Sequence, residues 1–345
     1  MTALAGLANS FGRLFGARIG VAVGEAVMAP TSVSLVSDYF PENKQGKPMG
    51  IITSGVYIGI GITLLGGGFL IDYLTELGGL HIPFIGYLKP WQATFMIVGV
   101  PGLFVAIGAF LLTEPKRFDE KIGQGHTIER QNVFLHISEH KKTLLPMFGG
   151  LIFMALIFYS FSFWAPTMMI RAYNISLSEA GFILGLITII SSIAGTIFAG
   201  FSVDYLRKKN YSDAPLRAAL FAVLLALPPI TILSFVNTEI GAWICIFLYL
   251  FFISSFAPLG LLAVSGVSAS NVKGQLAAIH AFLMMAFGLS LGPQLTAFFT
   301  DFVFMDPNNL KWSISATGAI VLPISALLFK VSLSRYKDSS EKLKV

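Results

Sequence analysis

The chain has 345 residues, of which 55% are hydrophobic and only 12% are charged, and its mean hydropathy is +0.76. A soluble domain of this length needs far less apolar surface to fill one core, so this composition excludes a soluble globular fold and predicts helices that face lipid. The formal net charge of +5 does not indicate a nucleic-acid partner, because the excess of Lys and Arg in a membrane protein is distributed between its loops.

Nine stretches are long and apolar enough to cross a bilayer as helices, since a spanning helix needs roughly 20 mostly apolar residues. The predicted spans cover residues 14–37, 49–74, 92–113, 144–170, 180–203, 216–236, 240–264, 275–300 and 313–334. Residues 1–10 form an apolar stub that is too short to span and lacks the basic start of a signal peptide. We interpret the stub as the end of a helix whose beginning is missing.

Lys and Arg are shared unevenly between the two sides of the predicted membrane, with eighteen on one side and five on the other. The richer side holds the loops around Lys47, Lys142, Lys208 and Lys273, and also the C-terminal tail. Cytoplasmic loops carry the excess of Lys and Arg, so this side and the C-terminus are predicted to be cytoplasmic. We expect a multi-pass protein of a bacterial inner membrane.

A polar stretch divides the chain into two helical halves. Residues 114–143 mix both charge signs and are predicted to be a cytoplasmic linker between residues 1–113 and residues 144–334, with a tail at 335–345. His126, His136 and His140 fall in this linker without the Cys or acidic neighbours of a metal site, so a solvated linker is preferred. Cys245, the single cysteine, cannot form an internal disulfide and is interpreted as a packing residue.

Two stretches of the chain resemble each other. Residues 44–72 and residues 272–301 each open with Lys and Gly, continue as a Gly-rich span and end in Asp. The glycines lie near helical spacing, which predicts close approach of a neighbouring helix; they are Gly55, Gly59, Gly66 and Gly67 in one copy and Gly288 and Gly292 in the other. Because many carriers build two repeated halves around a midplane site, the repeat favours a transporter.

Three motifs resemble the major facilitator superfamily, in particular its Spinster-like and anion:cation symporter-like branches. Residues 17–51, ARIGVAVGEAVMAPTSVSLVSDYFPENKQGKPMGI, resemble the family's fourth span and the loop into the fifth. Residues 200–209, GFSVDYLRKK, are similar to the second-half copy of its G-x-x-x-D-(R/K)-x-G-(R/K)-(R/K) loop, with Tyr205 and Arg207 departing from the pattern. Residues 288–293, GLSLGP, resemble its eleventh span.

The resemblance covers essentially the whole chain and implies an all-α, polytopic membrane helix bundle. The visible spans match the family's fourth to twelfth, with a stub of the third, so the first two spans and their signature loop are absent. Residues 49–74 also lack the Gly-Pro pair of the family's antiporter motif.

Arg18 and Glu25 are the first candidate site residues, because an ionisable group near the bilayer centre costs on the order of 3 kcal/mol and needs a partner or a purpose. They lie seven residues apart, which is two helical turns on one face and roughly 10 Å along the axis. One interpretation is structural, with Glu25 neutralising a cation and Arg18 reaching the interface. In the other, which the resemblance to Spinster-like carriers favours, Glu25 binds a proton or cation and Arg18 binds an anion.

Aromatic and imidazole side chains form a second group of candidates for the substrate or proton site. Tyr159 and Trp164 precede Pro166, which can break a helix where a gate must bend, although aromatic residues near a span end are more often an interfacial belt. Tyr57 and His280 are weaker candidates. His280 titrates in a useful range, but a single His in a span is more often simply hydrogen-bonded.

Four charged residues are candidates for a cytoplasmic gate. Asp204, Arg207 and Lys208 belong to the second-half loop, which in the family latches neighbouring helices in one state of the cycle. As plain charges they would only satisfy the positive-inside rule. Asp38 resembles the acid that partners the first-half loop.

These features predict secondary active transport of a small organic solute by alternating access, with proton movement as the driving force. The substrate class suggested by Arg18 is an organic anion, and that suggested by the many Phe and Met residues is an amphipathic molecule. The alternatives are a non-transporting carrier-like sensor and an inactive truncated product. No HExxH or GxSxG motif indicates an enzyme, and no cofactor is predicted. We expect three partners, which are the solute, a proton and the lipid bilayer, and no nucleic acid. We also expect the protein to be a monomer.

Overall fold

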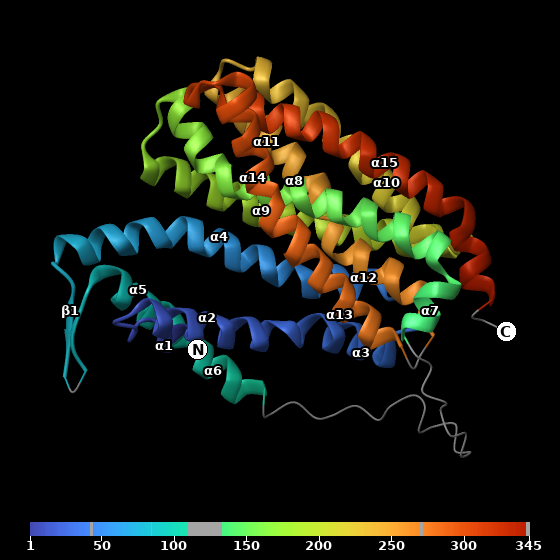
Figure 1. The fold of residues 1–345 in the computed structure, drawn as a ribbon, viewed down its shortest axis with the longest axis horizontal. Coiled ribbons are helices and arrows are strands. Elements are labelled where there is room, and N and C mark those ends of the chain that lie inside the picture. Colours follow the sequence, from blue (N-terminus) through green and yellow to red (C-terminus); the bar gives the residue numbers. More distant parts are fainter. Residues whose placement is uncertain (42–43, 84, 110–132, 270–271, 343–345) are drawn as a thin grey trace.

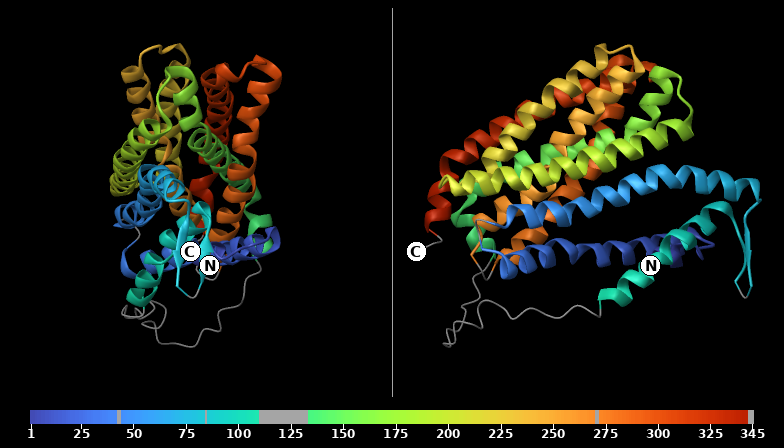
Figure 2. Two further views of the ribbon diagram at one scale, coloured as in Figure 1. Left: turned by 90° about the vertical axis from the view of Figure 1, so that its left-hand side faces the viewer. Right: turned by 180° about the vertical axis from the view of Figure 1, so that it is seen from behind.

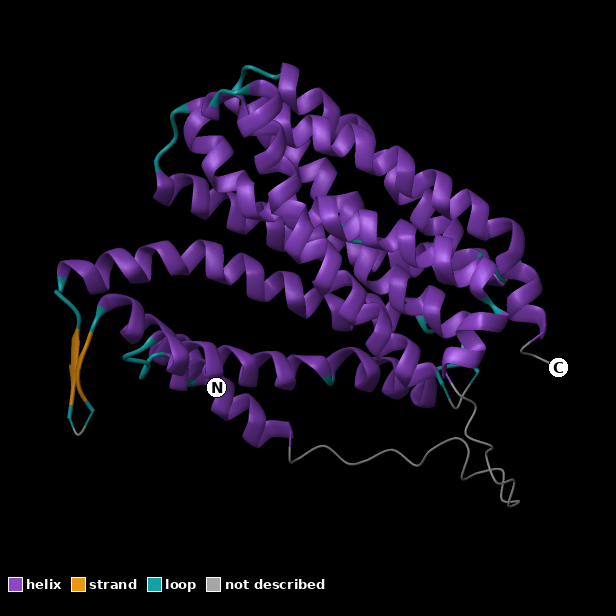
Figure 3. Cartoon of the chain, viewed as in Figure 1, coloured by secondary structure: helices purple, strands orange, loops and turns teal. Residues whose placement is uncertain are grey.

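The computed structural model describes residues 1–41, 44–83, 85–109, 133–269 and 272–342. Most of the predicted linker, at 114–132, and the end of the tail, at 343–345, lie outside these residues. Helices dominate the described chain (Figure 3). The elements before the linker, here called the first helix set, are α1 (Thr2–Ala5), α2 (Phe11–Ala26), α3 (Met28–Tyr39), α4 (Gly46–Glu76), β1 (Leu80–Ile82), β2 (Gly86–Leu88), α5 (Pro90–Gly99) and α6 (Pro101–Ala109).

A short helix, α7 (Val133–Glu139), leads from the linker into the second helix set. That set consists of α8 (Lys141–Tyr173), α9 (Leu177–Lys208), α10 (Ala214–Ile232), α11 (Glu239–Ile253), α12 (Phe256–Gly266), α13 (Lys273–Leu283), α14 (Ser290–Phe298) and α15 (Leu310–Lys342). Two π-helical segments, Met284–Leu289 and Phe299–Phe304, flank α14, and short 3-10 turns follow α10 at Leu233–Phe235 and precede α15 at Pro307–Asn309.

Eight helical segments of the described chain are long and apolar enough to cross a membrane, and they match the second to ninth predicted spans. The first predicted span, residues 14–37, is helical on either side of a turn at Val27 and therefore forms the two shorter helices α2 and α3. Pro30 explains the turn, because it has no N–H to donate to the carbonyl of Ala26. The protein is an integral, multi-pass, helical membrane protein.

Proline has different effects at different positions along the spans. The span predicted at 240–264 is interrupted at Ser254 and Ser255, where α11 ends and α12 begins with Pro258 in its first turn. The helix α8, by contrast, is continuous through Pro166, so the break expected there is absent. The span of α11 and α12 is therefore interrupted at Ser254 and Ser255, and that of α8 is not.

The core of the second set is built around α8, which packs against α15, α14 and the π-helical segment Met284–Leu289. Glycines allow this approach, since the positions of Gly288 and Gly292 lie directly against the α8 backbone at Ala155 and Leu156, as the repeat predicts. Buried hydroxyls join three helices through Ser160, Thr296 and Thr317, with oxygen–oxygen distances of 2.6 and 2.9 Å. These bonds satisfy polar groups in a region without water.

A β-hairpin between α4 and α5 is an element that the helical pattern does not predict. Strands β1 and β2 pair antiparallel, with His81 opposite Tyr87. The helix α4 ends before it at Gly78 and Gly79, whose φ angles of 70° and 107° are those that glycine adopts readily. The hairpin projects from the end of the bundle opposite α7 and the C-terminus (Figure 1).

The two helix sets meet chiefly through α4 and α9, which run side by side (Figures 1 and 2). The contact uses Gly46, Gly50 and Gly61 of α4, where an added Cβ would strike the backbone or side chains of α9. The predicted glycines Gly55, Gly59, Gly66 and Gly67 instead meet no atom of another helix in the described chain, because they lie on other faces of α4. A second contact joins α3 to α13, at the end of the bundle near α7.

Candidate functional site

Asp204, near the end of α9, links the two helix sets by hydrogen bonds to the start of α4. Its carboxylate oxygens accept bonds from the backbone N–H groups of Gly46 and Lys47, at 2.9 and 3.0 Å. The first N–H groups of a helix have no intrahelical partner, and the helix dipole favours a negative charge there. One carboxylate of the second set therefore caps a helix of the first set. We refer to this contact as the Asp204 latch.

The latch lies at one end of the bundle, which we call the basic end. Lys47, Lys208 and Lys273 lie at helix termini there, and the ammonium group of Lys47 lies 5.3 Å from the centroid of the Phe201 ring. Lys208 is exposed, and Arg207 is half-buried. Asp38 lies near the end of α3 and bonds locally, accepting from the hydroxyl of Ser34 at 3.4 Å.

A second link between the sets lies deeper, at the interruption between α11 and α12. The hydroxyl of Tyr57, a residue of α4 that is only 1% exposed, donates to the carbonyl of Ser254 at 2.5 Å. Pro258 lies four residues after Ser254 and has no N–H, so it leaves this carbonyl without its usual helical partner. The first set thus supplies the donor that the second set lacks.

Tyr57 also belongs to an aromatic cluster that continues into the second set. Its ring meets Phe158 of α8 edge to face at 5.6 Å, and Phe158 lies 5.1 Å from Phe256 of α12. Tyr159 completes the cluster, at 6.1 Å from Phe256. The sequence predicted Tyr57 and Tyr159 but not the two phenylalanines, which only the pairing of α4, α8 and α12 brings together.

Glu25, on α2, is a charged candidate within electrostatic range of this cluster. Its exposed carboxylate is close enough to Tyr159 for the two groups to interact electrostatically, and Tyr159 interacts in the same way with Tyr57. Arg18 is also exposed on α2, two turns earlier. Tyr159 of the second set thus interacts electrostatically with both Glu25 and Tyr57 of the first set, and Arg18 lies on the same helix as Glu25.

Trp164 and His280 have surroundings that differ from those of the cluster. The indole N–H of Trp164 donates to the carbonyl of Pro293 at 2.9 Å, which ties α8 to α14. His280 is 4% exposed, lies against Gly260 of α12, and has no hydrogen-bond partner on either ring nitrogen in the described chain. A buried imidazole without partners is the opposite of the hydrogen-bonded His that the sequence favoured.

No group of three or more His, Cys, Asp or Glu side chains that could hold a metal ion is present among the described residues. The candidate side chains themselves offer charge and hydrogen bonding. The carboxylate of Glu25 lies within electrostatic range of the Tyr159 phenol, and Asp204 and Tyr57 supply hydrogen bonds between the two helix sets.

Comparison with known proteins agrees with this architecture. Residues 1–293 match the family described as Major Facilitator Superfamily. The chain is 24% identical to a probable L-galactonate transporter of Escherichia coli, over 64% of this chain and 48% of the relative. It is also 24% identical to an MFS-type efflux pump of Mycolicibacterium smegmatis, over 98% of this chain and 75% of the relative.

A solved structure shows the same fold. It is a bacterial homolog of the human lysosomal transporter Spinster, in an inward-facing and unoccupied conformation, with a TM-score of 0.60 and 20% identity over 99% of this chain and 80% of that chain. These relatives are transporters and not enzymes. The chain spans about half the length of the galactonate transporter, at 48%.

Proposed function

The chain belongs to the Major Facilitator Superfamily, and we propose that it moves a small organic anion across a membrane by alternating access, with proton movement as the driving force. Alternating access requires two helix sets that rock about a central site. The division at the linker into residues 1–113 and 144–334 supplies these sets in our proposal.

The observation that carries the proposal is the Asp204 latch. It joins the two sets through bonds from one side chain to two backbone N–H groups, at 2.9 and 3.0 Å. Such a contact can open and close without unfolding a helix, because the N–H groups of Gly46 and Lys47 can bond to water instead. We assign the latched arrangement to a state that is closed at the basic end, and Arg207 and Lys208 to the same gate.

The positive-inside rule places the basic end in the cytoplasm in our proposal. The C-terminus would then be cytoplasmic, and the membrane a bacterial inner membrane. The protein would work as a monomer, because the central site lies between two helix sets of one chain.

Arg18 and Glu25 define the proposed central site. Arg18 would bind the carboxylate of the solute, since a guanidinium matches carboxylate geometry. Glu25 would carry the proton, with the Tyr159 hydroxyl as its neighbour across the site. The similarity to a probable L-galactonate transporter supports a sugar acid as the first solute to test.

Uptake of radiolabelled L-galactonate into proteoliposomes tests the proposal, with an inward proton gradient across the membrane. We expect uptake by the unaltered chain that an ionophore abolishes. Arg18→Ala should remove uptake, whereas Arg13→Ala, on the same helix and bonded locally to Asn9, should not. Glu25→Gln should remove gradient-driven uptake while leaving exchange of external for internal solute.

Three results would contradict the proposal. Binding of the solute without uptake under any ion gradient would favour the sensor function, and equal effects of the two Arg variants would remove Arg18 from the site. Uptake at the same rate with and without the proton gradient would contradict proton coupling but not transport.

A further inference from the structure

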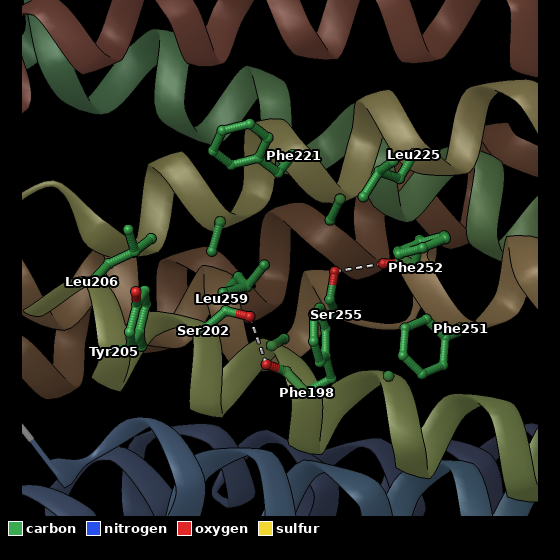
Figure 4. A pocket seen from close by; sticks show the side chains of 14 residues that line it. Phe198, Ser202, Tyr205, Leu206, Phe221, Leu225, Phe251, Phe252, Ser255 and Leu259 are labelled. Carbon is green, nitrogen blue, oxygen red and sulfur yellow. Dashed lines mark hydrogen bonds between the residues drawn. The ribbon is translucent and has the colours of Figure 1, made fainter.

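An apolar groove lies on the second helix set, and none of the candidate residues of the proposed central site lines it. It has a volume of about 310 Å³ and lies between α9, α10 and the junction of α11 with α12 (Figure 4). Phe198, Phe221 and Tyr205 line it and are 54%, 59% and 58% exposed. The groove therefore opens outward, to the surface that faces lipid.

The sequence explains why a groove forms there. Small residues recur four apart on both neighbouring helices, as Gly195 and Ala199 on α9 and as Ala218 and Ala222 on α10. Residues four apart share one helix face, so both helices present a shallow face to the same space. The interruption at Ser255 ends α11 beside that space.

The groove is mostly apolar, and the hydroxyls of its two serines are engaged in hydrogen bonds. The hydroxyl of Ser202 donates to the carbonyl of Phe198 at 2.8 Å, and that of Ser255 donates to the carbonyl of Phe252 at 2.6 Å (Figure 4). Both hydroxyls are thus satisfied by backbone carbonyls three or four residues earlier in the chain. An occupant of this groove is held by burial of its apolar surface, which suits an acyl chain.

Positive charge gathers where the groove meets the basic end. The ammonium group of Lys209 lies 4.6 Å from the centroid of the Tyr205 ring, which lines the groove, and Lys208 is exposed beside it. The two acidic residues nearest in sequence to these lysines, Asp204 and Asp213, already have partners. Asp204 bonds to α4, and Asp213 forms an ion pair of 2.6 Å with Arg217. The charge of the two lysines is therefore not neutralised by these acids.

We propose that the groove binds an anionic glycerophospholipid, with one acyl chain between α9 and α10 and the headgroup against Lys208 and Lys209. The combination of an apolar groove with lysines at its mouth matches the two parts of such a lipid. A zwitterionic lipid would gain the apolar contact but little from the lysines, because its net charge is zero.

Thermal unfolding in detergent, with added phosphatidylglycerol or with phosphatidylcholine of the same acyl chains, tests the proposal. We expect phosphatidylglycerol to raise the unfolding temperature at a concentration about tenfold or more below that of phosphatidylcholine, since basic residues near the membrane each add to the affinity for anionic lipid. Soluble glycerol phosphate should produce no shift, because it has the headgroup charge without the acyl chain.

Two pairs of variants locate the site. Lys208→Gln with Lys209→Gln should remove the difference between the two lipids, whereas Lys141→Gln with Lys142→Gln, exposed at the start of α8, should keep it. Ala222→Leu should weaken the binding of both lipids, because the larger side chain fills the groove. Ala194 is exposed on α9 outside the groove, so Ala194→Leu should leave the binding of both lipids unchanged.

Several results would overturn the proposal. They are equal effects of the two lipids on the unaltered chain, an undiminished difference in the Lys208→Gln and Lys209→Gln variant, and a shift with glycerol phosphate alone. A native mass spectrum in which Ala222→Leu dissociates a dimer would assign the groove to a second copy instead. None of these measurements depends on transport, so the proposed function can fail while the lipid site stands.

Discussion

The hydroxyl of Tyr57 lies 2.5 Å from the carbonyl oxygen of Ser254, the one backbone acceptor that Pro258 deprives of its helical donor. A helix of the first set thus completes the backbone hydrogen bonding of the second. Losing this donor leaves a buried carbonyl unsatisfied, which costs about 1–3 kcal/mol in addition to the bond itself.

We therefore predict that Tyr57→Phe destabilises the protein more than Tyr249→Phe does. Tyr249 is equally buried and donates to the carbonyl of Ile157 at 3.0 Å, but that carbonyl lies within the continuous helix α8 and keeps its helical donor. Thermal unfolding of the two variants measures the difference. Equal losses would mean that the Ser254 carbonyl finds another donor when Tyr57 is removed.

The Asp204 latch predicts a local change in hydrogen exchange. In Asp204→Asn the N–H groups of Gly46 and Lys47 lose a charged acceptor, and a bond to a charged group contributes about 1.5–3 kcal/mol. Exchange of these two amides should speed up by roughly tenfold or more, since about 1.4 kcal/mol is a factor of ten. Hydrogen–deuterium exchange with mass spectrometry reads the segment at the start of α4.

Asp213→Asn is the matched control for this prediction. Asp213 pairs with Arg217 within the second set at 2.6 Å and makes no hydrogen bond to α4 among the described residues. Its loss should leave exchange at Gly46 unchanged. Faster exchange in both variants would mean that the effect spreads through the bundle and does not arise from the cap.

The sequence predicts the spans well because hydropathy depends only on composition along the chain. Their contacts depend on how each helix is rotated, which hydropathy does not specify. Spacing within α4 favoured Gly55 and Gly59, but the face turned to the second set carries Gly46, Gly50, Tyr57 and Gly61, at intervals of four, seven and four residues. Only the pairing of α4 with the second set selects this face.

Some residues of the candidate site also carry a signal in the sequence, and others become visible only when the helices are paired. A charged residue in a span is visible in the sequence because of its cost, so Glu25 was predicted. Phe158 and Phe256 are two of 31 phenylalanines and carry no such signal. The acceptor of Tyr57 depends on an interrupted helix, and Pro258 is the sequence signal that could have indicated it.

A pair of glycine variants on α4 should have effects of opposite sign. In Gly50→Ala the new Cβ would lie 2.6 Å from the Thr196 carbonyl oxygen, which is backbone and cannot move aside alone. In Gly55→Ala the new Cβ meets no atom within 4 Å, so only the gain of about 0.5–1 kcal/mol for Ala over Gly in a helix remains. We expect the unfolding temperature to fall for Gly50→Ala and to rise for Gly55→Ala. Two rises would mean that α4 and α9 separate freely at this position.

His280 offers a comparison between stability and function. Its ring is buried with both nitrogens unpaired, and an unpaired buried polar group costs about 1–3 kcal/mol, so His280→Leu should raise the unfolding temperature. His136→Leu, which loses a bond of 2.9 Å to the carbonyl of Val267, should lower it. Because neither ring nitrogen has a structural hydrogen bond in the described chain, we infer a role for His280 in the proton cycle, in which its neutral imidazole accepts and releases a proton.

Gradient-driven uptake in the His280→Leu protein tests that role. We expect uptake to fall although the protein is more stable, and exchange of solute without a gradient to persist. If the variant is stabilised and its gradient-driven uptake is unchanged, His280 has no part in proton movement. If it is destabilised, the ring nitrogens have partners in the working protein, and the reason for assigning the role disappears.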